Sequence, residues 1–437
     1  MTLVARAFQI ADRAADALGI GAQPTRLESL LAAAERRSGV AGSTPDHIEA
    51  PLRALLHAYE TEADLSLFGR MAVRWDMVRF LANLMRLHEE ERRDPALLSQ
   101  PIEAPLLITG LPRSGTTFLH GLLAEDPGNL VPRCWQTIFP YPLPGERPGS
   151  DARARRVDRQ LRGFTRIAPE FRGVHPLDSR TPQECTEITA HSFMSLRFDT
   201  THHIPSYRRW LDATGHESAY RMHRRFLQHL QAQAIGATAP GSRRWVLKSP
   251  DHVFAFDALS IVYPDARLVF VHRDPLKVLP SVAKLTEILR APFTRRIDRR
   301  QIGQQVGDHW ARGVAAMMDA DRRELFPHGR VLHLHYRELV AAPVETVARL
   351  YRHFGMEFTP EARGRIADAV RSRPQGGYEH QAYRFEEHGL DVACERERFA
   401  AYTAHFAVET EMDAPRPSPP RGGRGVAAAP LPIAPPA

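Results

Sequence analysis

The spacing of apolar residues along the chain changes near residue 105. Upstream of this point, apolar side chains recur every three or four positions, as at Val73, Met77 and Leu84. This period matches a helical turn and keeps the apolar side chains on one face. The pattern therefore predicts helices throughout residues 1–100.

Downstream, short apolar runs alternate with helix-like segments. Strands that alternate with helices are typical of an α/β protein with a mostly parallel sheet and right-handed crossovers. Ligands of such sheets bind at the carboxyl ends of the strands. Lys248, Arg273 and Tyr336 lie at the carboxyl ends of three of the runs, so we expect them at one edge of the sheet. The predicted strands are 105–109, 245–247, 267–271 and 331–336.

Pattern and composition together divide the chain into four regions. A helical N-terminal region (1–100) precedes an α/β core (101–358), and a second helical region (359–412) is expected to close over this core. Residues 413–437 are rich in Pro, Gly and Ala, a composition that predicts disorder.

Two helices are predicted around candidate functional residues of the core. Over 181–198, Glu184, Glu187 and His191 are spaced by three and four positions, which places them on one helix face. A second helix is predicted over 251–263, directly after one of the strands.

The bulk composition, 43% hydrophobic and 25% charged, is that of a globular protein. The formal net charge is +7, from 58 Lys and Arg against 51 Asp and Glu. An arginine-rich chain suits a polyanionic ligand, but the excess is spread too widely to predict nucleic-acid binding. Residues 151–172 are strongly basic and predict a solvated helix face.

The three cysteines, Cys134, Cys185 and Cys394, are far apart and odd in number, so no disulfide framework is indicated. No run approaches the roughly 18 apolar residues of a membrane-spanning helix. The N-terminus lacks the apolar segment of a signal peptide. These observations predict a cytoplasmic protein.

The loop after the first predicted strand carries the strongest chemical signal. Gly110 and Gly115 enclose four residues, as in a Walker A loop, and a helix-like segment begins at Thr116. Such a loop directs backbone N–H groups and a helix N-terminus at an anion. Thr116 and Thr117 stand where a Walker A loop has Lys-Ser/Thr, and the loop's cation is Arg113. The loop therefore fits a phosphosulfate, which needs no bridging metal, better than a magnesium-bound triphosphate.

The sequence PRSGTT at 112–117 resembles the 5′-phosphosulfate loop of sulfotransferases that use 3′-phosphoadenosine 5′-phosphosulfate (PAPS). This form of the loop is similar to that of bacterial and tyrosylprotein sulfotransferases. The resemblance implies a P-loop-like core with PAPS as co-substrate and no metal. It implies that Arg113 is a catalytic cation. It also implies that the 5′ end of the nucleotide is bound by Arg113, Ser114, Gly115, Thr116 and Thr117.

Two further stretches resemble the same family. VFVHRDPLKVLPSVAKL at 269–285 is similar to the 3′-phosphate motif, in which a strand-end arginine precedes a helix serine. It implies that Arg273 and Ser281 hold the 3′-phosphate. WVLKSPDH at 245–252 resembles the stretch that points a lysine at the transferring group, which implies that Lys248 is a second catalytic cation.

The motifs do not specify the general base that deprotonates the acceptor hydroxyl. Relatives place a glutamate a little after the loop helix, whereas this chain has Gln136, which cannot accept a proton. Glu184 and His252 are the leading candidates, and Glu187 follows them. A histidine at a helix start beside the sheet edge is expected to have a pKa near neutrality.

Together these residues predict in-line, metal-free transfer of a sulfuryl group to a hydroxyl on a small molecule, lipid or glycan. One alternative is a P-loop kinase or NTPase, which Thr116 at the lysine position disfavours. Another is an inactive nucleotide-binding protein, which Gln136 leaves open. His333 and His335 alternate along a predicted strand, but their spacing supplies no third or fourth ligand, so no metal site is predicted. The motifs do not indicate the oligomeric state.

Overall fold

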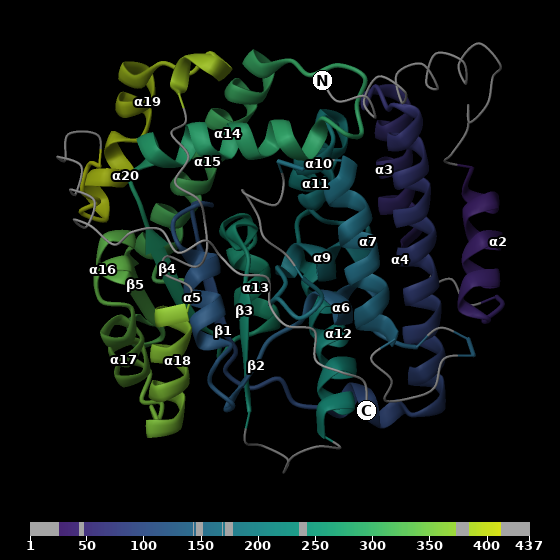
Figure 1. Cartoon of the computed structure of the whole chain (residues 1–437), viewed down its shortest axis with the longest axis horizontal. Coiled ribbons are helices and arrows are strands. Elements are labelled where there is room, and N and C mark those ends of the chain that lie inside the picture. Colours follow the sequence, from purple (N-terminus) through teal and green to yellow (C-terminus); the bar gives the residue numbers. More distant parts are fainter. Residues whose placement is uncertain are drawn as a thin grey trace, which may run out of the picture.

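The computed structural model describes residues 26–42, 48–142, 144–145, 152–167, 169–170, 178–235, 243–372 and 384–411 (Figure 1). Its strands form one parallel sheet in the order β2-β3-β1-β4-β5. This arrangement confirms the predicted α/β class. The four predicted strands are all present, each within one residue of its expected bounds. The strands are β1 (Leu106–Gly110), β2 (Asn129–Leu130), β3 (Arg244–Lys248), β4 (Arg267–His272) and β5 (Val331–His335).

Strand β2 is the one strand of the described sheet that the hydrophobic pattern did not predict. It has only two residues, and it pairs with the start of β3 through Asn129↔Arg244 and Leu130↔Trp245. A segment this short shows no alternation of apolar and polar positions. Its strand geometry depends on the neighbouring β3, so local sequence does not reveal it.

Helices surround the sheet and extend well beyond it (Figure 1). The α-helices of the described ranges are α2 (Leu27–Ser38), α3 (Glu49–Thr61), α4 (Leu67–Arg93), α5 (Thr116–Leu123), α6 (Cys134–Ile138), α7 (Ala152–Ile167), α9 (Cys185–Thr189), α10 (Arg197–Thr201), α11 (Pro205–Thr214), α12 (Glu217–Ile235), α13 (Phe256–Val262), α14 (Pro275–Arg290), α15 (Arg299–Arg322), α16 (Tyr336–Ala341), α17 (Pro343–His353), α18 (Pro360–Ser372), α19 (Val392–Arg398) and α20 (Ala400–His405). Short 3-10 helices are η2 (Pro95–Ser99), η3 (Ala190–Ser192), η4 (Pro250–Phe254), η5 (His328–Arg330) and η7 (Phe385–His388).

The central strand β1 is buried on both faces, and successive side chains enter two different cores. Leu107 belongs to a large cluster with side chains of α4, α12, α13, α14 and α15. Ile108 belongs to a second cluster with side chains of α5, α17 and α18. The sheet is therefore the middle layer of a three-layer structure. Truncating Leu107 or Ile108 to alanine is expected to cost about 2–5 kcal/mol, because a cavity would remain.

Two predicted helices differ from the structure. Residues 181–198 form α9, η3 and α10 rather than one helix, because Phe193 adopts the left-handed conformation with φ +56°. The Phe193 side chain is fully buried, so tertiary packing outweighs the local preference for a continuous helix. Residues 251–263 are likewise divided between η4 and α13, with Ala255 between them in a non-helical conformation (φ −132°, ψ +23°).

The terminal regions are helical where the structure describes them. Helices α2, α3 and α4 occupy the N-terminal region, and α19 and α20 pack against α14 and α15 (Figure 1). Residues 1–25 and the tail 413–437 lie outside the described residues, so the predictions for them stand as predictions. Within the described ranges, no helix combines the length and the apolar content needed to cross a bilayer.

The carboxyl ends of the strands gather the candidate functional residues at one edge of the sheet. The glycine loop follows β1, Lys248 ends β3, Arg273 follows β4, and Tyr336 follows β5. Because all of these strands are parallel, their carboxyl ends point the same way, as the pattern predicted.

Candidate active site

Two glycines shape the loop that joins β1 to α5. Gly110 has φ +134°, and a Cβ there would lie 2.4 Å from the carbonyl oxygen of Val271 on β4. Gly115 has φ +93°, and a Cβ there would lie 3.1 Å from the ring of Tyr336. Glycine alone adopts these conformations readily and leaves the space that the neighbours need. The loop is therefore held close to the strand ends.

The loop presents an anion-binding helix start. Gly115 caps α5 without a side chain, so no side-chain oxygen covers the first turn of this helix. The first N–H groups of a helix have no intrahelical acceptor and lie at the positive end of the helix dipole. The Ser114 hydroxyl donates to the carbonyl of Leu111 at 2.6 Å and so stabilises the loop itself. This donor set fits the oxygens of a phosphosulfate.

Lys248 points its ammonium group at the start of α5. Its side chain is 1% exposed, and its Nζ lies 3.1 Å from Thr117 Oγ1. The ammonium also forms an ion pair with the carboxylate of Glu184. A buried ammonium requires such a partner. The chain has only three lysines, whereas arginine is abundant. At this position the cation is therefore a compact ammonium group rather than the planar guanidinium used elsewhere in the protein.

Glu184 and Glu187 belong to different charge networks. Glu184 is the residue before α9 and pairs with Lys248. Glu187 lies inside α9 and pairs with Arg79 at 2.7 Å and with Arg197 at 2.9 Å. The expectation that both carboxylates share one helix face is therefore wrong. Glu187 is held in a structural network, and Glu184 is the carboxylate beside the loop helix.

His252 is fully buried in η4, directly after β3. Its Nδ1 lies 2.6 Å from the hydroxyl of Tyr220, and its Nε2 has no partner among the described residues. Burial lowers the pKa of His252 well below its ordinary value, and the charges of His223 and Lys248 lower it further. The expectation of a pKa near neutrality is therefore wrong, because the imidazole lies in the protein interior.

Asp251 is a further candidate, which the sequence motifs did not indicate. It is half-buried, and it follows Lys248 by three residues at the start of η4. Burial and then the negative charge of Glu184 raise the pKa of Asp251 to about 7, although Arg208 and Lys248 act in the opposite direction. Asp251 therefore exchanges a proton near neutral pH. Its position in the KSPDH stretch was visible in the sequence, but its burial was not.

Gln136, where the family resemblance implied a glutamate, has a structural role. Its side-chain oxygen accepts a hydrogen bond from the backbone N–H of Arg133 at 2.9 Å and so caps α6. An amide serves this purpose without introducing a charge. Gln136 therefore stabilises the start of α6, and its amide cannot accept a proton from an acceptor hydroxyl.

The structure brings Arg113, Ser281 and Arg273 together on the β4 side of the loop. Arg113 has a positive φ of +62° and donates from Nε to Ser281 Oγ at 3.1 Å. Arg273 donates from Nη1 to the backbone carbonyl of Arg113 at 2.6 Å. The two stretches that resemble the 5′ and 3′ motifs are therefore in direct contact.

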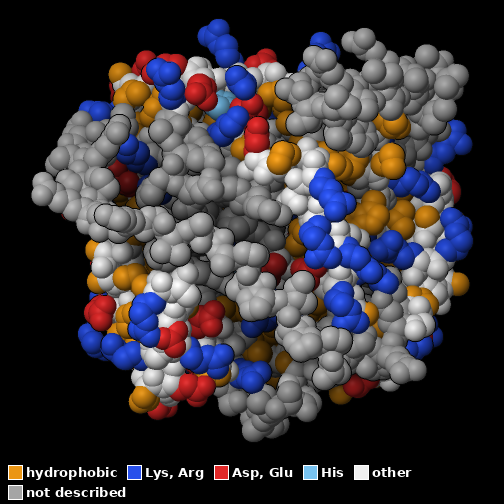
Figure 2. Space-filling view, in the orientation of Figure 1, with side chains coloured by type: hydrophobic (Ala, Val, Ile, Leu, Met, Phe, Trp, Pro, Cys, Tyr) orange, Lys and Arg blue, Asp and Glu red, His pale blue; other side chains and the backbone are white. Residues whose placement is uncertain are grey.

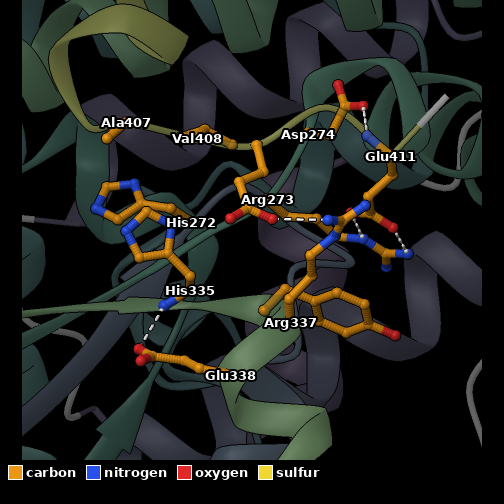
Figure 3. A pocket seen from close by; sticks show the side chains of 11 residues that line it. His272, Arg273, Asp274, His335, Arg337, Glu338, Ala407, Val408 and Glu411 are labelled. Atoms are coloured by element: carbon orange, nitrogen blue, oxygen red, sulfur yellow. Dashed lines mark hydrogen bonds and ion pairs between the residues drawn. The ribbon is translucent and has the colours of Figure 1, made fainter. Parts of the chain in front are cut away.

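Arg273 lines a cavity of about 290 Å³ beside β4 and β5 (Figure 3). Its guanidinium lies over the ring of Tyr336, 3.7 Å from the ring centre. The carboxylate of Glu411 accepts two hydrogen bonds from Arg273, at 2.9 and 3.1 Å. The backbone N–H of Glu411 donates to Asp274 Oδ2 at 2.6 Å. Glu411 is 138 residues away from Arg273, so no local pattern pointed to it.

His333 and His335 both lie against His272, as their alternation on β5 implies. The rings of His272 and His333 stack, and His272 Nε2 lies 2.8 Å from His333 Nδ1. The ring of His335 is tilted against that of His272 at 5.6 Å. Across the described ranges, no group of three or more His, Cys, Asp or Glu side chains has an arrangement that suits a metal ion.

Residues 105–360, more than half of the chain, match the model of the sulfotransferase family. The matched residues begin with β1 and include the glycine loop, Lys248, Arg273 and Ser281. Among curated proteins, the omega-hydroxy-beta-dihydromenaquinone-9 sulfotransferase Stf3 of Mycobacterium bovis and Mycobacterium tuberculosis is 24% identical over 289 residues. This alignment covers 61% of the chain and 67% of Stf3.

Two solved structures are similar over most of the chain. Sulfotransferase STF1 from Mycobacterium tuberculosis H37Rv has a TM-score of 0.74 and 29% identity, covering 86% of this chain and 98% of STF1. Sulfotransferase STF9 from Mycobacterium avium has a TM-score of 0.78 and 27% identity, covering 89% of this chain and 98% of STF9. The similarity therefore extends from the core to the flanking helices.

Proposed function

The chain belongs to the sulfotransferase family, and from this membership we propose which of its residues bind PAPS and transfer the sulfuryl group. It is an enzyme that takes this group from PAPS. The kinase or NTPase alternative is not favoured, because the matched family and the similar structures are sulfotransferases. We propose that transfer is in line and needs no metal, with positive charge supplied by side chains and helix α5.

The contact of Lys248 with both Thr117 and Glu184 at the start of α5 is the observation that carries this proposal. When bound, PAPS supplies the electrophilic sulfuryl group. The amides of residues 114–117 and the guanidinium of Arg113 would hold the 5′ end. Lys248 would stabilise the negative charge that develops on the bridging oxygen. A fixed cation in a water-poor site is worth about 2–4 kcal/mol, by comparison with oxyanion donors.

We propose Glu184 as the general base. Its side chain is 27% exposed, so an acceptor hydroxyl can reach it, whereas His252 is 0% exposed. The neighbouring Lys248 keeps the Glu184 carboxylate beside the reacting group. Asp251, with a pKa of about 7, would take up the proton or release it to solvent. In this arrangement Glu187 has no chemical role.

Arg273 and Ser281 would bind the 3′-phosphate, and this requires an exchange of partners. In the structure, Arg273 is paired with the carboxylate of Glu411. A phosphate carries more charge and more acceptor oxygens than a carboxylate, so it would replace Glu411 on the guanidinium. The Glu411 contact also supports a role for residues 359–412 in closing over the nucleotide site.

The acceptor in this proposal is a hydroxyl on a small molecule, lipid or glycan. The relative Stf3 is named for a hydroxylated menaquinone derivative, which supports the first two classes. We propose that residues 1–100 shape the acceptor side of the site, because α4 contributes Arg79 to the network that holds α9. The reaction would occur in the cytoplasm, where PAPS would be made in a bacterium.

The test is transfer of labelled sulfate from PAPS to a panel of alcohols in the presence of EDTA, with calorimetry of PAPS and ATP in parallel. The expected result is label transfer that EDTA does not reduce, and much tighter binding of PAPS than of ATP. Transfer that collapses with EDTA and returns with magnesium would contradict the metal-free mechanism. Preferential binding of ATP would contradict the choice of nucleotide.

A further inference from the structure

Helix α7 carries most of the net charge of the protein. Its sequence, ARARRVDRQLRGFTRI, contains six arginines and one aspartate, which gives a net charge of +5. The net charge of the whole chain is +7. The charge excess is therefore concentrated on one helix, and the expectation that it is spread widely is wrong.

Four of these arginines form a row on the outer face of α7. Arg155, Arg159, Arg162 and Arg166 are exposed, and their spacing of four, three and four residues places them on one side of the helix. At a rise of 1.5 Å per residue, the row is about 16 Å long. Among the described residues, none of the four guanidinium groups has an ion-pair partner. Figure 2 shows basic side chains gathered in the region of α7.

Two other charged side chains of α7, those of Arg153 and Asp158, contact neighbouring segments of the protein. Arg153 donates to the carbonyls of Phe139 and Pro140 at 3.2 and 2.7 Å. Asp158, the only acid of the helix, accepts a hydrogen bond from the backbone N–H of Ser179 at 2.9 Å. These contacts anchor the inner face, but they leave the outer charges uncompensated. Four like charges along one face repel each other, so the stability of the helix does not explain them.

The arginine row adjoins the segment that carries Glu184. Val157 packs in one cluster with Cys134 and Phe139, which places α7 on α6. The start of α6 is hydrogen-bonded to residues 179–181, through Trp135 N to Ser179 O at 2.9 Å and Cys134 N to Thr181 O at 3.0 Å. This segment leads directly to Glu184. A partner bound along the row would therefore lie beside the proposed acceptor side of the site.

We propose that the arginine row of α7 docks the protein on an anionic lipid surface, from which the acceptor hydroxyl is taken. This inference rests on the proposed function, and it narrows the acceptor class to lipids. A straight, exposed row suits a plane of phosphate headgroups better than a small ligand, which would need a cavity. The outer face also has no aromatic side chain on which a nucleic-acid base would stack.

Docking would be electrostatic rather than insertive. Val157 and Leu161 of α7 pack in the cluster with α6, and Phe164 packs against Ile288 of α14, so these apolar side chains are not available to enter the acyl region. Basic side chains near an anionic leaflet each strengthen binding by about fivefold. This attraction is screened over about 10 Å at moderate ionic strength, so salt should weaken it strongly.

The experiment compares co-sedimentation with phosphatidylcholine vesicles that contain or lack phosphatidylglycerol. The test variant replaces the row with neutral side chains of similar helix propensity: Arg155→Gln, Arg159→Gln, Arg162→Gln and Arg166→Gln. The control variant removes the same charge at scattered exposed positions: Arg209→Gln, Arg322→Gln, Arg352→Gln and Arg396→Gln. The parent is expected to bind only the vesicles that contain phosphatidylglycerol. Its affinity for them should fall at least about tenfold in the test variant and less than about threefold in the control variant.

Three results would overturn this proposal. The first is equal binding of the parent to neutral and anionic vesicles. The second is an equal loss of vesicle affinity in the test and control variants. The third is binding of the arginine row to soluble heparin without binding of the protein to vesicles. Calorimetry with 3′-phosphoadenosine 5′-phosphate (PAP) separates this proposal from the proposed function. Both variants should bind PAP as the parent does. A parent that binds vesicles but not PAP would contradict the nucleotide site and leave the docking surface intact.

Discussion

The strands on either side of β1 each lead to a cation paired with a carboxylate, but the two pairs differ in construction. On the β3 side, Lys248 is 1% exposed and pairs with Glu184 of the adjoining core segment. On the β4 side, Arg273 is 20% exposed and pairs with Glu411, which lies beyond the last helix, α20. The first pair is part of the core, whereas the second depends on a terminal segment.

This difference matches the two proposed roles: the Lys248 pair would act in sulfuryl transfer, and Arg273 would recognise the 3′-phosphate. A buried charge that loses its partner is strongly destabilised, so the Lys248 pair is held in place whether or not nucleotide is bound. A more exposed pair costs little to open, and an anionic ligand can take the place of Glu411. The site would therefore keep its transfer machinery preorganised while its recognition arginine changes partners.

The largest effect is expected for Lys248→Ala. If Lys248 acts on the transition state, kcat and kcat/KM should both fall about a hundredfold to a thousandfold. PAP affinity should change little, because Arg113 and Arg273 still hold both phosphate ends. Steady-state kinetics and calorimetry measure the two quantities, and Lys284→Ala serves as the control. Loss of PAP affinity by the same factor as kcat would show that Lys248 is a recognition residue instead.

For Arg273→Ala we expect a loss of nucleotide recognition rather than of the transfer step. A charge-assisted bond to phosphate is worth about 1.5–3 kcal/mol, so the preference for PAPS over its 3′-dephosphorylated form should fall about tenfold to a hundredfold. Competition binding with the two nucleotides measures this preference. If the variant discriminates between them as well as the parent does, the 3′-phosphate lies elsewhere.

The raised pKa of Asp251 predicts that the free energy of unfolding depends on pH. Its folded pKa of about 7 lies above the unfolded value of about 3.9, so its contribution to stability is present below about pH 4 and is lost as pH rises to about 7. Between about pH 5 and pH 8, the parent should lose about 1–2 kcal/mol relative to Asp251→Asn, after allowance for partial solvation. Urea unfolding at both pH values measures this difference. A parallel pH response of the two proteins would exclude the raised pKa.

The smallest effect is expected for Glu411→Gln, on the affinity for PAP. Removing a carboxylate that competes for Arg273 should raise PAP affinity about twofold to tenfold, as the strength of a partly exposed ion pair allows. Glu409→Gln is the matched control, because Glu409 pairs with Arg337 at 2.6 Å in the same cavity. Weaker PAP binding in Glu411→Gln would mean that Glu411 supports the nucleotide site rather than competing for it.

The sheet and the glycine loop were predictable because their signals are local. Short apolar runs that end in polar residues mark buried parallel strands, and Gly110 and Gly115 mark positions where a side chain would clash. The strand ends then place Lys248, Arg273 and the loop together through topology alone.

The remaining features depend on contacts that local sequence does not encode. The break at Phe193 is set by burial of its ring against Phe80. The low pKa of His252 and the high pKa of Asp251 follow from their depth in the protein. Glu411 lies beyond the matched residues 105–360 and 138 residues after Arg273, and no periodicity connects the two.

A single-turnover measurement of label transfer from PAPS at saturating nucleotide would test whether Lys248 acts in chemistry and Arg273 in recognition. The three proteins are the parent, Lys248→Ala and Arg273→Ala, each with an alcohol acceptor found in the panel. We expect transfer by Lys248→Ala to remain slow by about a hundredfold or more at saturation, whereas Arg273→Ala approaches the parental rate once its weaker binding is overcome. A parental rate in Lys248→Ala, together with a persistent defect in Arg273→Ala, would contradict the separation of chemistry from recognition.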